Sequence, residues 1–394
     1  MVDYDVLVIG AGPVGSTFAF CIAQKGDKVG GLGKKKKIGV PLQCAGLLSA
    51  KIREINDLPD EFIINKVRGA YLHSPSDHVI KVSKKETQAY VIDRVEYDKY
   101  LSQKAQDAGA EILLQHKVSN VDTSSSKVKM ANTGQKVLQS KILAGCGGHC
   151  SVVSSAMNNS YNSVDAAQFL IEMKSNPLET DFVDVYVDEH ISPGFIWSIP
   201  LSPHLSRLGL FGHHDYKKLN HILKNFINSN DKFQGAKVIS KYHGKIPVFD
   251  LNKKIVENRA IILGDAASQV KPTTGGGLLI GFECAKFAAE AAIKSLESDD
   301  PELLKDYETS YKNKFLKELK NQLQVQKTFQ ELKNQELDNM FLKLKEKGAE
   351  DLISSYGDMD SQSLLVKEMI KRRILFSVLP QLLYRRMSRL WNFF

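Results

Sequence analysis

YDVLVIGAGPVGSTFAFCIAQKG, which occupies residues 4–26, places the pattern GxGxxG between a short apolar segment and a predicted helix. Residues 4–9 are apolar and mostly β-branched or leucine, which is typical of a buried parallel strand. Residues 16–25 are predicted to form a helix that Gly26 ends. The order of strand, glycine turn and helix predicts an α/β fold of the Rossmann type.

The glycines of this turn predict a dinucleotide site. Gly10 permits the tight turn, Gly12 lets the backbone approach a pyrophosphate, and Gly15 lets the helix pack closely on the strand. Pro13 belongs to this turn and is a candidate binding residue, and the first N–H groups of the helix that follows are free to bind phosphate. A plain glycine-rich turn is the alternative interpretation.

The second strand of such a fold is expected at residues 28–33. This segment contains Gly30, Gly31 and Gly33, which predicts a poor strand. Gly33 also stands where a carboxylate ordinarily binds ribose hydroxyls. The lysine run 34–37 that follows is interpreted as a solvated loop. We therefore expect weaker nucleotide binding than in a protein that has an acid at this position.

A second nucleotide signature follows the apolar residues 259–263, which are predicted to form another buried strand. An apolar helix is expected at about 278–295. Between them lie the candidate binding residues Gly264, Asp265, Pro272, Gly275, Gly276 and Gly277. Asp265 can accept a hydrogen bond from a ribityl or ribose hydroxyl, and the glycine triplet can press against a ring or phosphate at the start of the helix.

Composition limits the class of protein. The chain has 394 residues, of which 43% are hydrophobic and 25% charged, so it can bury a large core in two domains. Five cysteines without a CxxC pair indicate neither a disulfide framework nor a metal site, and a reducing, cytosolic compartment is expected. We expect no signal peptide and no membrane-spanning helix, because the apolar runs are short.

Taken together, these motifs resemble the flavoprotein fold of the para-hydroxybenzoate hydroxylase type. Asp93-Arg94, with Tyr97-Asp98 beyond, adds to that resemblance. Within this fold the chain resembles the geranylgeranyl reductase family, including the archaeal digeranylgeranylglycerophospholipid reductases. The narrower match rests on IGVPLQCAGL at 38–47, on GFIWSIP at 194–200 with Gly209 beyond, and on PTTGGG at 272–277.

The resemblance implies a bound FAD and a reaction that saturates isoprenoid C=C bonds. It places the loop residues Gln43, Cys44, Ala45 and Gly46, together with Arg94, near the flavin, and makes Cys44 the candidate proton donor. It assigns Phe195, Trp197, Pro200 and Gly209 to the substrate. The alternatives are inert packing for Cys44 and Trp197, and a surface ion pair with Asp93 or Asp98 for Arg94.

The chain departs from the family pattern at several positions. The Ala-Asp-Gly common at the end of one strand appears as Cys146-Gly147-Gly148, so Gly147 replaces a second acid. Phe195 and Ile199 flank the Trp where the family usually has Tyr and Phe. Phe211 stands where a glycine is usual. The losses at Gly33 and Gly147 fall at places that face the nucleotide or flavin.

We predict an α/β protein with a Rossmann-like FAD-binding domain at 1–160 and 244–300. An antiparallel-sheet substrate domain is expected at 161–243, and a helical region with a basic tail at 301–394. Since the sequence contains one GxGxxG, the electron donor is expected to visit transiently, either as NAD(P)H or as a reduced electron carrier, with an electron-carrier protein among the expected partners.

The C-terminal segment 371–394 combines six basic residues and no acid with many apolar ones. This pattern predicts an amphipathic segment that binds an anionic membrane surface, so the protein is expected to be cytoplasmic and peripheral on the membrane. Packing on the protein's own core is the main alternative, and nucleic-acid binding is not expected because no recognised fold for it is present.

The favoured function is therefore FAD-dependent reduction of a geranylgeranyl lipid, a membrane phospholipid precursor or a prenyl diphosphate. No metal is expected. The enzyme alternative is a flavin-dependent monooxygenase or halogenase on the same fold. The alternative outside enzymes is a prenyl-lipid binding protein that has lost redox activity, for which Gly33 and Gly147 are the motive.

Overall fold

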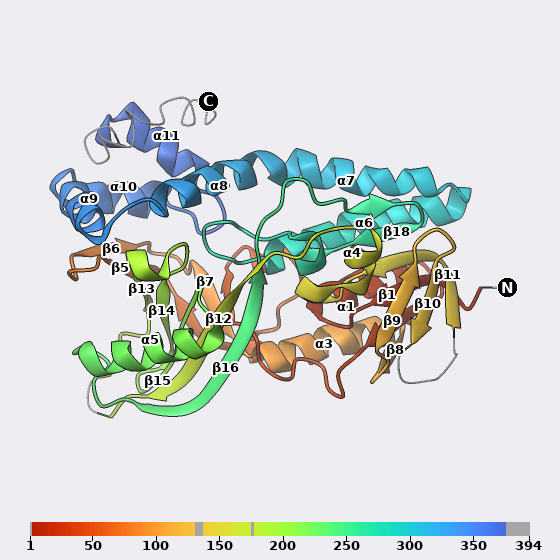
Figure 1. Cartoon of the computed structure of the whole chain (residues 1–394), viewed down its shortest axis with the longest axis horizontal. Helices are drawn as coiled ribbons and strands as arrows, with labels where there is room; N and C mark the ends of the chain where they lie inside the picture. The colour runs from red at the N-terminus through yellow and green to blue at the C-terminus, as the bar shows by residue number, and fades with distance from the viewer. Residues whose placement is uncertain (1, 131–136, 175–176, 376–394) are drawn as a thin grey trace.

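The computed structural model describes residues 2–130, 137–174 and 177–375. Figure 1 shows two sheet-containing parts side by side, with C-terminal helices running along one side of both. The first part holds the nucleotide motifs, and the second holds the GFIWSIP segment. The mixed α/β fold, with two principal sheets and a helical C-terminal region, is as predicted.

The first sheet is parallel at its centre. Its strand order is β17-β18-β11-β1-β2-β8; β10 extends it through antiparallel pairing with β11, and β9 pairs antiparallel with β10. The strands are β1 (Tyr4–Ile9), β2 (Val29–Gly33), β8 (Glu111–Leu114), β9 (Val118–Asp122), β10 (Lys127–Met130), β11 (Val137–Gly145), β17 (Val256–Glu257) and β18 (Ala260–Ile262). Helices α1 (Pro13–Ala23), α3 (Arg94–Asp107) and α6 (Leu278–Ser298) accompany it, and α1 packs against both others.

Strand β2 is regular and fully buried, so the expectation of a poor strand is wrong. Its glycines are required by the neighbouring side chains. A Cβ at Gly30 would lie 2.8 Å from the ring of Tyr4, and one at Gly31 would lie 2.5 Å from Ile112. Large residues of β1 and β8 therefore fill the space that side chains of β2 would otherwise occupy.

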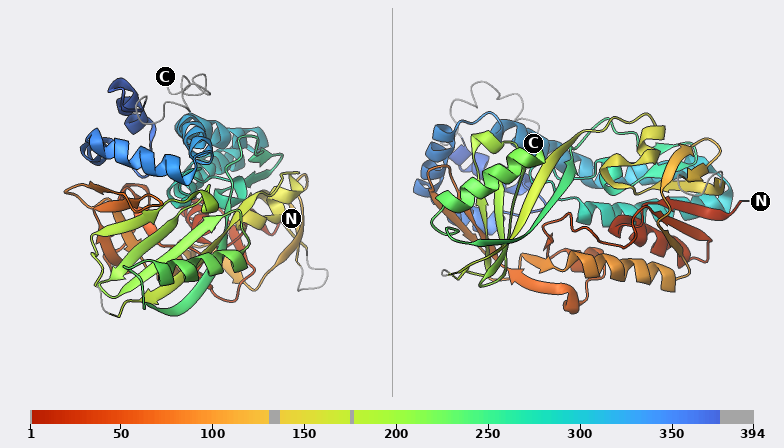
Figure 2. Two further views of the ribbon diagram at one scale, coloured as in Figure 1. Left: turned by 60° about the vertical axis from the view of Figure 1, so that its left-hand side comes forward. Right: turned by 60° about the horizontal axis from the view of Figure 1, so that its bottom comes forward.

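The second sheet is mostly antiparallel, with the order β16-β12-β15-β14-β13-β5-β6. Its strands are β5 (Gly69–His73), β6 (Val79–Ser83), β12 (Ser163–Glu172), β13 (Phe182–Tyr186), β14 (Ile196–Ser202), β15 (Leu205–Gly212) and β16 (Lys237–Pro247). Helix α5 (Tyr216–Ser229) covers one face, as both views of Figure 2 show, and buries Leu219, Leu223 and Ile227 against it.

The predicted range 161–243 omits two of these seven strands. β5 and β6 come from the N-terminal part of the chain, and β5 pairs in parallel with β13. A small third sheet has the order β3-β7-β4, and its strands flank this hairpin in the sequence. Its strands are β3 (Leu47–Ser49), β4 (Ile63–Val67) and β7 (Ala89–Ile92).

Helices form the C-terminal region. They are α7 (Lys305–Tyr311), a π-helical segment (Lys312–Leu316), α8 (Lys317–Phe329), α9 (Asn334–Glu346), α10 (Ala349–Tyr356) and α11 (Ser363–Lys371). The short helices α2 (Ile52–Ile55) and α4 (Val152–Ala156) lie earlier in the chain. Apolar residues of α9 and α10 pack on β5 and β6, which joins this region to the second sheet.

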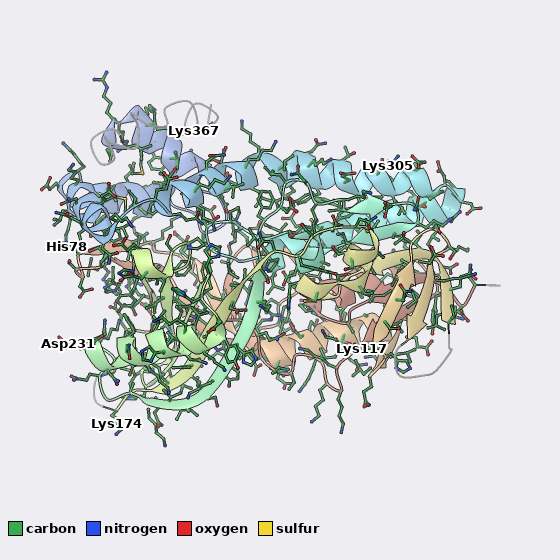
Figure 3. The ribbon with its side chains drawn as sticks, viewed as in Figure 1. His78, Lys117, Lys174, Asp231, Lys305 and Lys367 are labelled. Carbon is green, nitrogen blue, oxygen red and sulfur yellow. The ribbon has the colours of Figure 1, made fainter. Side chains whose placement is uncertain are left out.

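Positive charge is spread over the surface in the described part of the chain. Figure 3 shows three exposed lysines in separate places: Lys117 in the loop between β8 and β9, Lys305 on α7 and Lys367 on α11. Among the described residues, no helix combines the length and the apolar character that crossing a bilayer requires. Residues 376–394, which hold most of the predicted membrane-binding tail, lie outside the described residues.

Candidate active site

The turn between β1 and α1 has the close contacts that its glycines predict. Gly10 adopts φ +118°, and a Cβ there would lie 2.2 Å from the carbonyl oxygen of Cys146. A Cβ at Gly15 would lie 2.0 Å from the carbonyl oxygen of Gly10, so helix and strand touch at this point. Gly12 differs, since a Cβ there would meet nothing within 4 Å. Gly12 therefore borders open space at the start of the helix.

Helix α6 begins at the same cavity. Gly281 of α6 packs against α1 so closely that a Cβ would lie 2.6 Å from Val14. Neither helix has a side-chain cap at its N-terminus, where Gly12 and Gly277 are the cap residues. Two sets of backbone N–H groups are therefore available for an anionic or polar ligand.

Asp265 lies deep in this cavity, where its carboxylate is reached from the cavity space. Protein surrounds it closely, and this burial raises the pKa of Asp265 to about 6, although Arg94 acts in the opposite direction. A carboxylate in such a place is suited to accept hydrogen bonds from ligand hydroxyls.

Arg94 is buried rather than part of a surface ion pair. Its Nη2 donates to Asp98 at 2.9 and 3.1 Å. Burial opposes the charge of Arg94, but Asp98 and Cys44 outweigh it and raise the pKa of the guanidinium. Asp93 has another role, because its carboxylate caps α3 by accepting from the backbone N–H of Val95 and Glu96.

Cys44 interacts with two arginines, of which only Arg94 was a candidate from the sequence. The second is Arg207 on β15, which interacts electrostatically with Cys44. The backbone N–H of Gly46 donates to Sγ of Cys44 at 3.4 Å. The only signal for Arg207 in the sequence was that one arginine stands within a largely apolar strand. This residue belongs to no motif.

Three aromatic side chains, Phe195, Trp197 and Phe211, form a cluster on the cavity side of the second sheet. Phe195 and Phe211 meet edge to face, with ring centroids 5.1 Å apart. A Cβ at Gly209 would lie 2.4 Å from the Trp197 ring, so this glycine makes room for the indole. Nε1 of Trp197 donates to Gln168. Phe211, a departure from the family pattern, is therefore part of the cavity wall.

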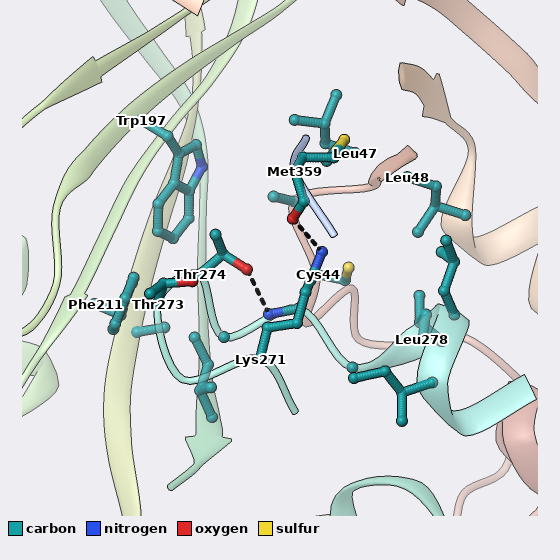
Figure 4. A pocket seen from close by; sticks show the side chains of 18 of the residues that line it. Cys44, Leu47, Leu48, Trp197, Phe211, Lys271, Thr273, Thr274, Leu278 and Met359 are labelled. Carbon is teal, nitrogen blue, oxygen red and sulfur yellow. Dashed lines mark hydrogen bonds between the residues drawn. The ribbon is translucent and has the colours of Figure 1, made fainter. Parts of the chain in front are cut away.

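A buried lysine lies between the aromatic cluster and Cys44. Figure 4 shows Lys271 extending from its loop to the main chain of Met359. Its Nζ donates to the Met359 carbonyl at 2.9 Å and to Asp360 at 2.8 Å. These bonds tie the glycine-rich loop at 271–277 to the segment between α10 and α11. No motif in the sequence indicated a role for Lys271 in the site.

One cavity of about 1670 Å³ is lined by the glycine turn, Asp265, Cys44, Arg94, the aromatic cluster and Lys271, whereas Arg207 lies outside its lining. We call the part bordered by Gly10, Gly12 and Asp265 the nucleotide end. The opposite part, the apolar end, lies between the β5–β6 hairpin and the C-terminal helices. Its lining includes Ala70, Leu72, Ile80, Val82, Leu337, Met340, Phe341, Leu344, Leu365, Val366, Met369 and Leu375. The volume exceeds the roughly 300–1,000 Å³ usual for one small ligand, so the cavity has room for a cofactor and a long apolar molecule together.

The predicted site residues divide into two groups. Those that line the cavity are Gly10, Gly12, Pro13, Gln43, Cys44, Ala45, Arg94, Phe195, Trp197, Asp265, Gly275, Gly276 and Gly277. Gly15, Gly46, Pro200, Gly209, Gly264 and Pro272 lie behind this lining. The carbonyl of Pro200, for example, accepts from Asn65, and that of Pro272 accepts from Gln326 of α8. Their roles in the geometry are packing and support.

The open space at Gly12, the two uncapped helices and the carboxylate of Asp265 fit an adenine dinucleotide. The fold and the site thus define an FAD-binding oxidoreductase. The sequence profile of the family described as "FAD binding domain" matches residues 3–315.

Relatives narrow this class. A digeranylgeranylglycerophospholipid reductase of Methanosarcina acetivorans is 30% identical over 365 residues, covering 87% of this chain and 89% of its own length. An uncharacterized protein of Methanocaldococcus jannaschii is 33% identical, covering 94% and 95% respectively. The chain belongs to the FAD-binding-domain family and, within it, to the family of the digeranylgeranylglycerophospholipid reductases.

Solved structures agree on the fold. A geranylgeranyl bacteriochlorophyll reductase-like protein from Thermoplasma acidophilum superimposes with a TM-score of 0.83 at 22% identity, covering 98% of this chain and 99% of that one. The myxobacterial chondrochloren halogenase gives a TM-score of 0.63 at 19% identity, covering 83% and 82%. The fold over most of this chain is therefore shared with a flavoprotein of different chemistry.

Proposed function

We propose that this protein is an FAD-dependent reductase that saturates isoprenoid C=C bonds of a geranylgeranyl lipid. The supporting observation is the continuity of the cavity, from the nucleotide end, past Cys44 and the aromatic cluster, to the apolar end. A geranylgeranyl chain is long and apolar, and the apolar end offers it a lining of aliphatic and aromatic side chains. A membrane phospholipid precursor and a prenyl diphosphate both carry such a chain.

The chemistry needs a hydride and a proton. Bound, reduced FAD supplies the hydride when a donor has recharged it. An isolated alkene is a poor hydride acceptor, so an acid must lie close to the carbon that receives the proton. Cys44 is the thiol that lines the cavity next to Arg94, and we assign the proton to it. The aromatic cluster would hold the chain against this group and exclude water.

Separating the two half-reactions tests this assignment. Cys44→Ala should slow alkene reduction by at least about a hundredfold, the scale of general acid catalysis, and leave reduction of the flavin by its donor nearly unchanged. Cys21→Ala, on α1 and outside the cavity lining, is the matched control. Equal loss of both half-reactions in Cys44→Ala would assign the residue to folding or flavin binding instead.

Oxygen separates the reductase from the monooxygenase and halogenase alternatives. A reductase should work without oxygen and add two hydrogen atoms to each bond, which the product mass shows. Incorporation of ¹⁸O from labelled oxygen, or a product that carries halide, would support the alternatives. A purified protein that contains prenyl lipid but no flavin would support the third alternative, a binding protein without redox activity.

We propose a transient electron donor, either NAD(P)H or a reduced carrier protein, because the sequence has one GxGxxG. Stopped-flow mixing of the oxidised flavoprotein with NADPH, NADH or a reduced ferredoxin-type carrier distinguishes the donors. Loss of the flavin absorbance with one donor alone identifies it. Failure of both nicotinamides to reduce the flavin would favour the carrier.

We also propose that the tail at 371–394 brings the protein to anionic membranes. Arg372 and Arg373 follow α11, and Leu375 lines the apolar end, so the tail begins where the prenyl chain would lie. Ile374 and Leu375 pack on the apolar residues of α9 and α10, which also fits the alternative of core packing for these two positions. Each basic residue near an anionic leaflet contributes about 1 kcal/mol.

Deletion of residues 381–394 tests the tail. The truncated protein should keep its flavin and its activity on a short, soluble prenyl substrate. It should no longer co-sediment with phosphatidylglycerol vesicles at low salt, and its activity on vesicle-borne lipid should fall. Loss of flavin or of folding on truncation would place the tail in the core and contradict the proposal.

A further inference from the structure

Arg207 occupies an unusual position for a charged residue. It lies near the middle of β15, opposite Leu170 of β12 and Ile199 of β14, and its exposed fraction is only 6%. The side chain extends from the second sheet to the loop at residues 38–46, which we call the flavin loop. There Nη1 donates to the carbonyl of Ala45 at 2.8 Å and to that of Ile92 at 3.2 Å.

The flavin loop is shaped to admit this guanidinium. A Cβ at Gly46 would lie 2.2 Å from Nη1 of Arg207, so no larger residue fits there without displacing the arginine. The same Gly46 donates its backbone N–H to Sγ of Cys44 at 3.4 Å. Arg207, Gly46 and Cys44 therefore form one connected unit, in which the sheet fixes the loop that carries the thiol.

The charge of Arg207 lacks a direct counter-ion. Arg94 has Asp98 at 2.9 Å, whereas no carboxylate oxygen in the described ranges lies within 4 Å of the Arg207 nitrogens. Burial lowers the pKa of Arg207, and Cys44 and Asp93 are the groups that most oppose this effect. A buried cation bonded to carbonyls alone is costly, unless a negative charge develops beside it.

We propose that Arg207 is a positioning residue that stabilises the negative charge left on Cys44 after the thiol donates its proton. This inference rests on the proposed reduction of an alkene. In that step the S–H bond breaks, its electron pair stays on sulfur, and a C–H bond forms at one alkene carbon. The other carbon receives the hydride of reduced FAD, so the substrate gains two hydrogens while the flavin is oxidised.

Two cations interact with Cys44. Arg94 on α3 interacts with Cys44 and is also paired with Asp98. Arg207 interacts with Cys44, Asp93, Tyr242 and Arg94, and Asp93 is already engaged in capping α3. Unlike Arg94, Arg207 has no carboxylate partner at ion-pair distance in the described ranges, so its charge adds to that of Arg94 at the sulfur. A cation beside a cysteine stabilises its thiolate.

Alkylation of Cys44 by iodoacetamide tests the proposal without turnover. The rate is followed by peptide mass spectrometry across pH 6–10 in substrate-free, FAD-loaded protein. In Arg207→Gln, the pH of half-maximal rate should rise by about one unit, which lowers the rate at neutral pH about tenfold. Arg207→Lys, which keeps the charge, should stay close to the wild type. The exposed Cys150 is an internal comparator in every sample.

A purely structural role gives a different result. If Arg207 only ties the loop to the sheet, Arg207→Gln should loosen the loop and speed alkylation at every pH, without moving the half-maximal pH; this outcome overturns the proposal. The same shift in Arg53→Gln, a surface arginine paired with Asp60, would also overturn it. Should Arg207→Gln lose its flavin, Arg207→His carries the same expectation, because imidazole is neutral above about pH 6.5.

Turnover then separates this proposal from the proposed function. If the alkylation profile shifts in Arg207→Gln and alkene reduction slows about tenfold, with its pH optimum displaced, both stand. If the profile shifts but the wild type reduces no alkene, the positioning role stands and the proposed reaction is wrong. If alkene reduction occurs and the profile does not move, Arg207 is not the stabilising group.

Discussion

The two ends of the cavity are built from different parts of the chain. The nucleotide end is bordered largely by backbone: a Cβ at Gly10 or at 275–277 would strike neighbouring protein atoms, and one at Gly12 would enter the open space at the start of α1. The apolar end consists of side chains from a strand hairpin and from helices far away in sequence.

This difference indicates how substitutions should impair ligand binding at each end. Backbone donors have one arrangement, so a single added side chain can exclude the cofactor completely. Apolar side chains act collectively through buried area, so the apolar end should lose affinity in steps. Substitutions at the two ends should therefore change different measurements by different amounts.

The largest effect is expected at Gly12. Its backbone angles suit any residue and a Cβ meets no protein atom, so Gly12→Leu should fold and yet fill the space of the pyrophosphate. FAD affinity should fall by a hundredfold or more, roughly 3 kcal/mol, as measured by fluorescence titration of the apoprotein. Gly15→Leu is the contrasting variant, since its Cβ strikes the backbone of Gly10, and it should not fold. A yellow Gly12→Leu protein would contradict this account of the nucleotide end.

A smaller effect is expected at the apolar end. Val366→Asp places a charge in the lining and should raise KM for a geranylgeranyl substrate in detergent about tenfold, or ~1.4 kcal/mol. The flavin spectrum and the activity on a short prenyl substrate should be unchanged. Leu364→Asp is the matched control, since Leu364 is 55% exposed and lies outside the lining. Equal effects of the two variants would argue against a chain in this part of the cavity.

A pH effect of about the same size is expected from Asp265. Its ionised carboxylate accepts from ligand hydroxyls more strongly than the protonated form does, and its pKa of about 6 means that protons compete with FAD below that pH. FAD affinity should therefore be constant above pH 7 and decline toward pH 5, by up to about tenfold. Asp265→Asn should bind FAD more weakly at pH 7 and lose this pH dependence. A wild-type affinity that stays flat to pH 5 would remove Asp265 from the FAD contacts.

The smallest effect is expected at Gly33. A glutamate there could bond ribose hydroxyls, which is worth about 1.5–3 kcal/mol, but a Cβ at Gly33 would lie 2.9 Å from Leu114. Gly33→Glu alone should therefore bring little gain. Combined with Leu114→Ala it should tighten FAD severalfold in the same titration. The single variant Leu114→Ala is the control, and a double variant no tighter than that control would show that another group already holds the ribose.

The sequence predicted the backbone geometry of the nucleotide end, because this geometry depends on positions that only glycine can occupy. Gly10 and Gly15 lie where the spacing requires, and α6 starts directly after the glycine triplet. The poor strand expected at 28–33 was wrong for the converse reason. The glycines of β2 are set by Tyr4 and Ile112 of neighbouring strands, and a single-strand pattern does not contain that information.

The rest of the site depends on tertiary contacts that have no spacing rule. Arg207 reaches Cys44 only because β15 lies beside the flavin loop, and Lys271 reaches Asp360 only because the segment after α10 folds back. Trp197 was predicted as a substrate residue by resemblance, and the structure adds that it packs over Gly209. Phe211, noted as a departure, joins the same cluster.

The hairpin of β5 and β6 has a consequence for engineering. Because these strands come from the N-terminal part of the chain and join the second sheet, the chain passes back and forth between the two sheets before it reaches α6. The part of the chain that forms the second sheet and the apolar end therefore cannot be exchanged by cutting the chain at only two points. A chimera that exchanges substrate range between relatives must transplant residues 63–92 and 161–247 together, with the helices that pack on them.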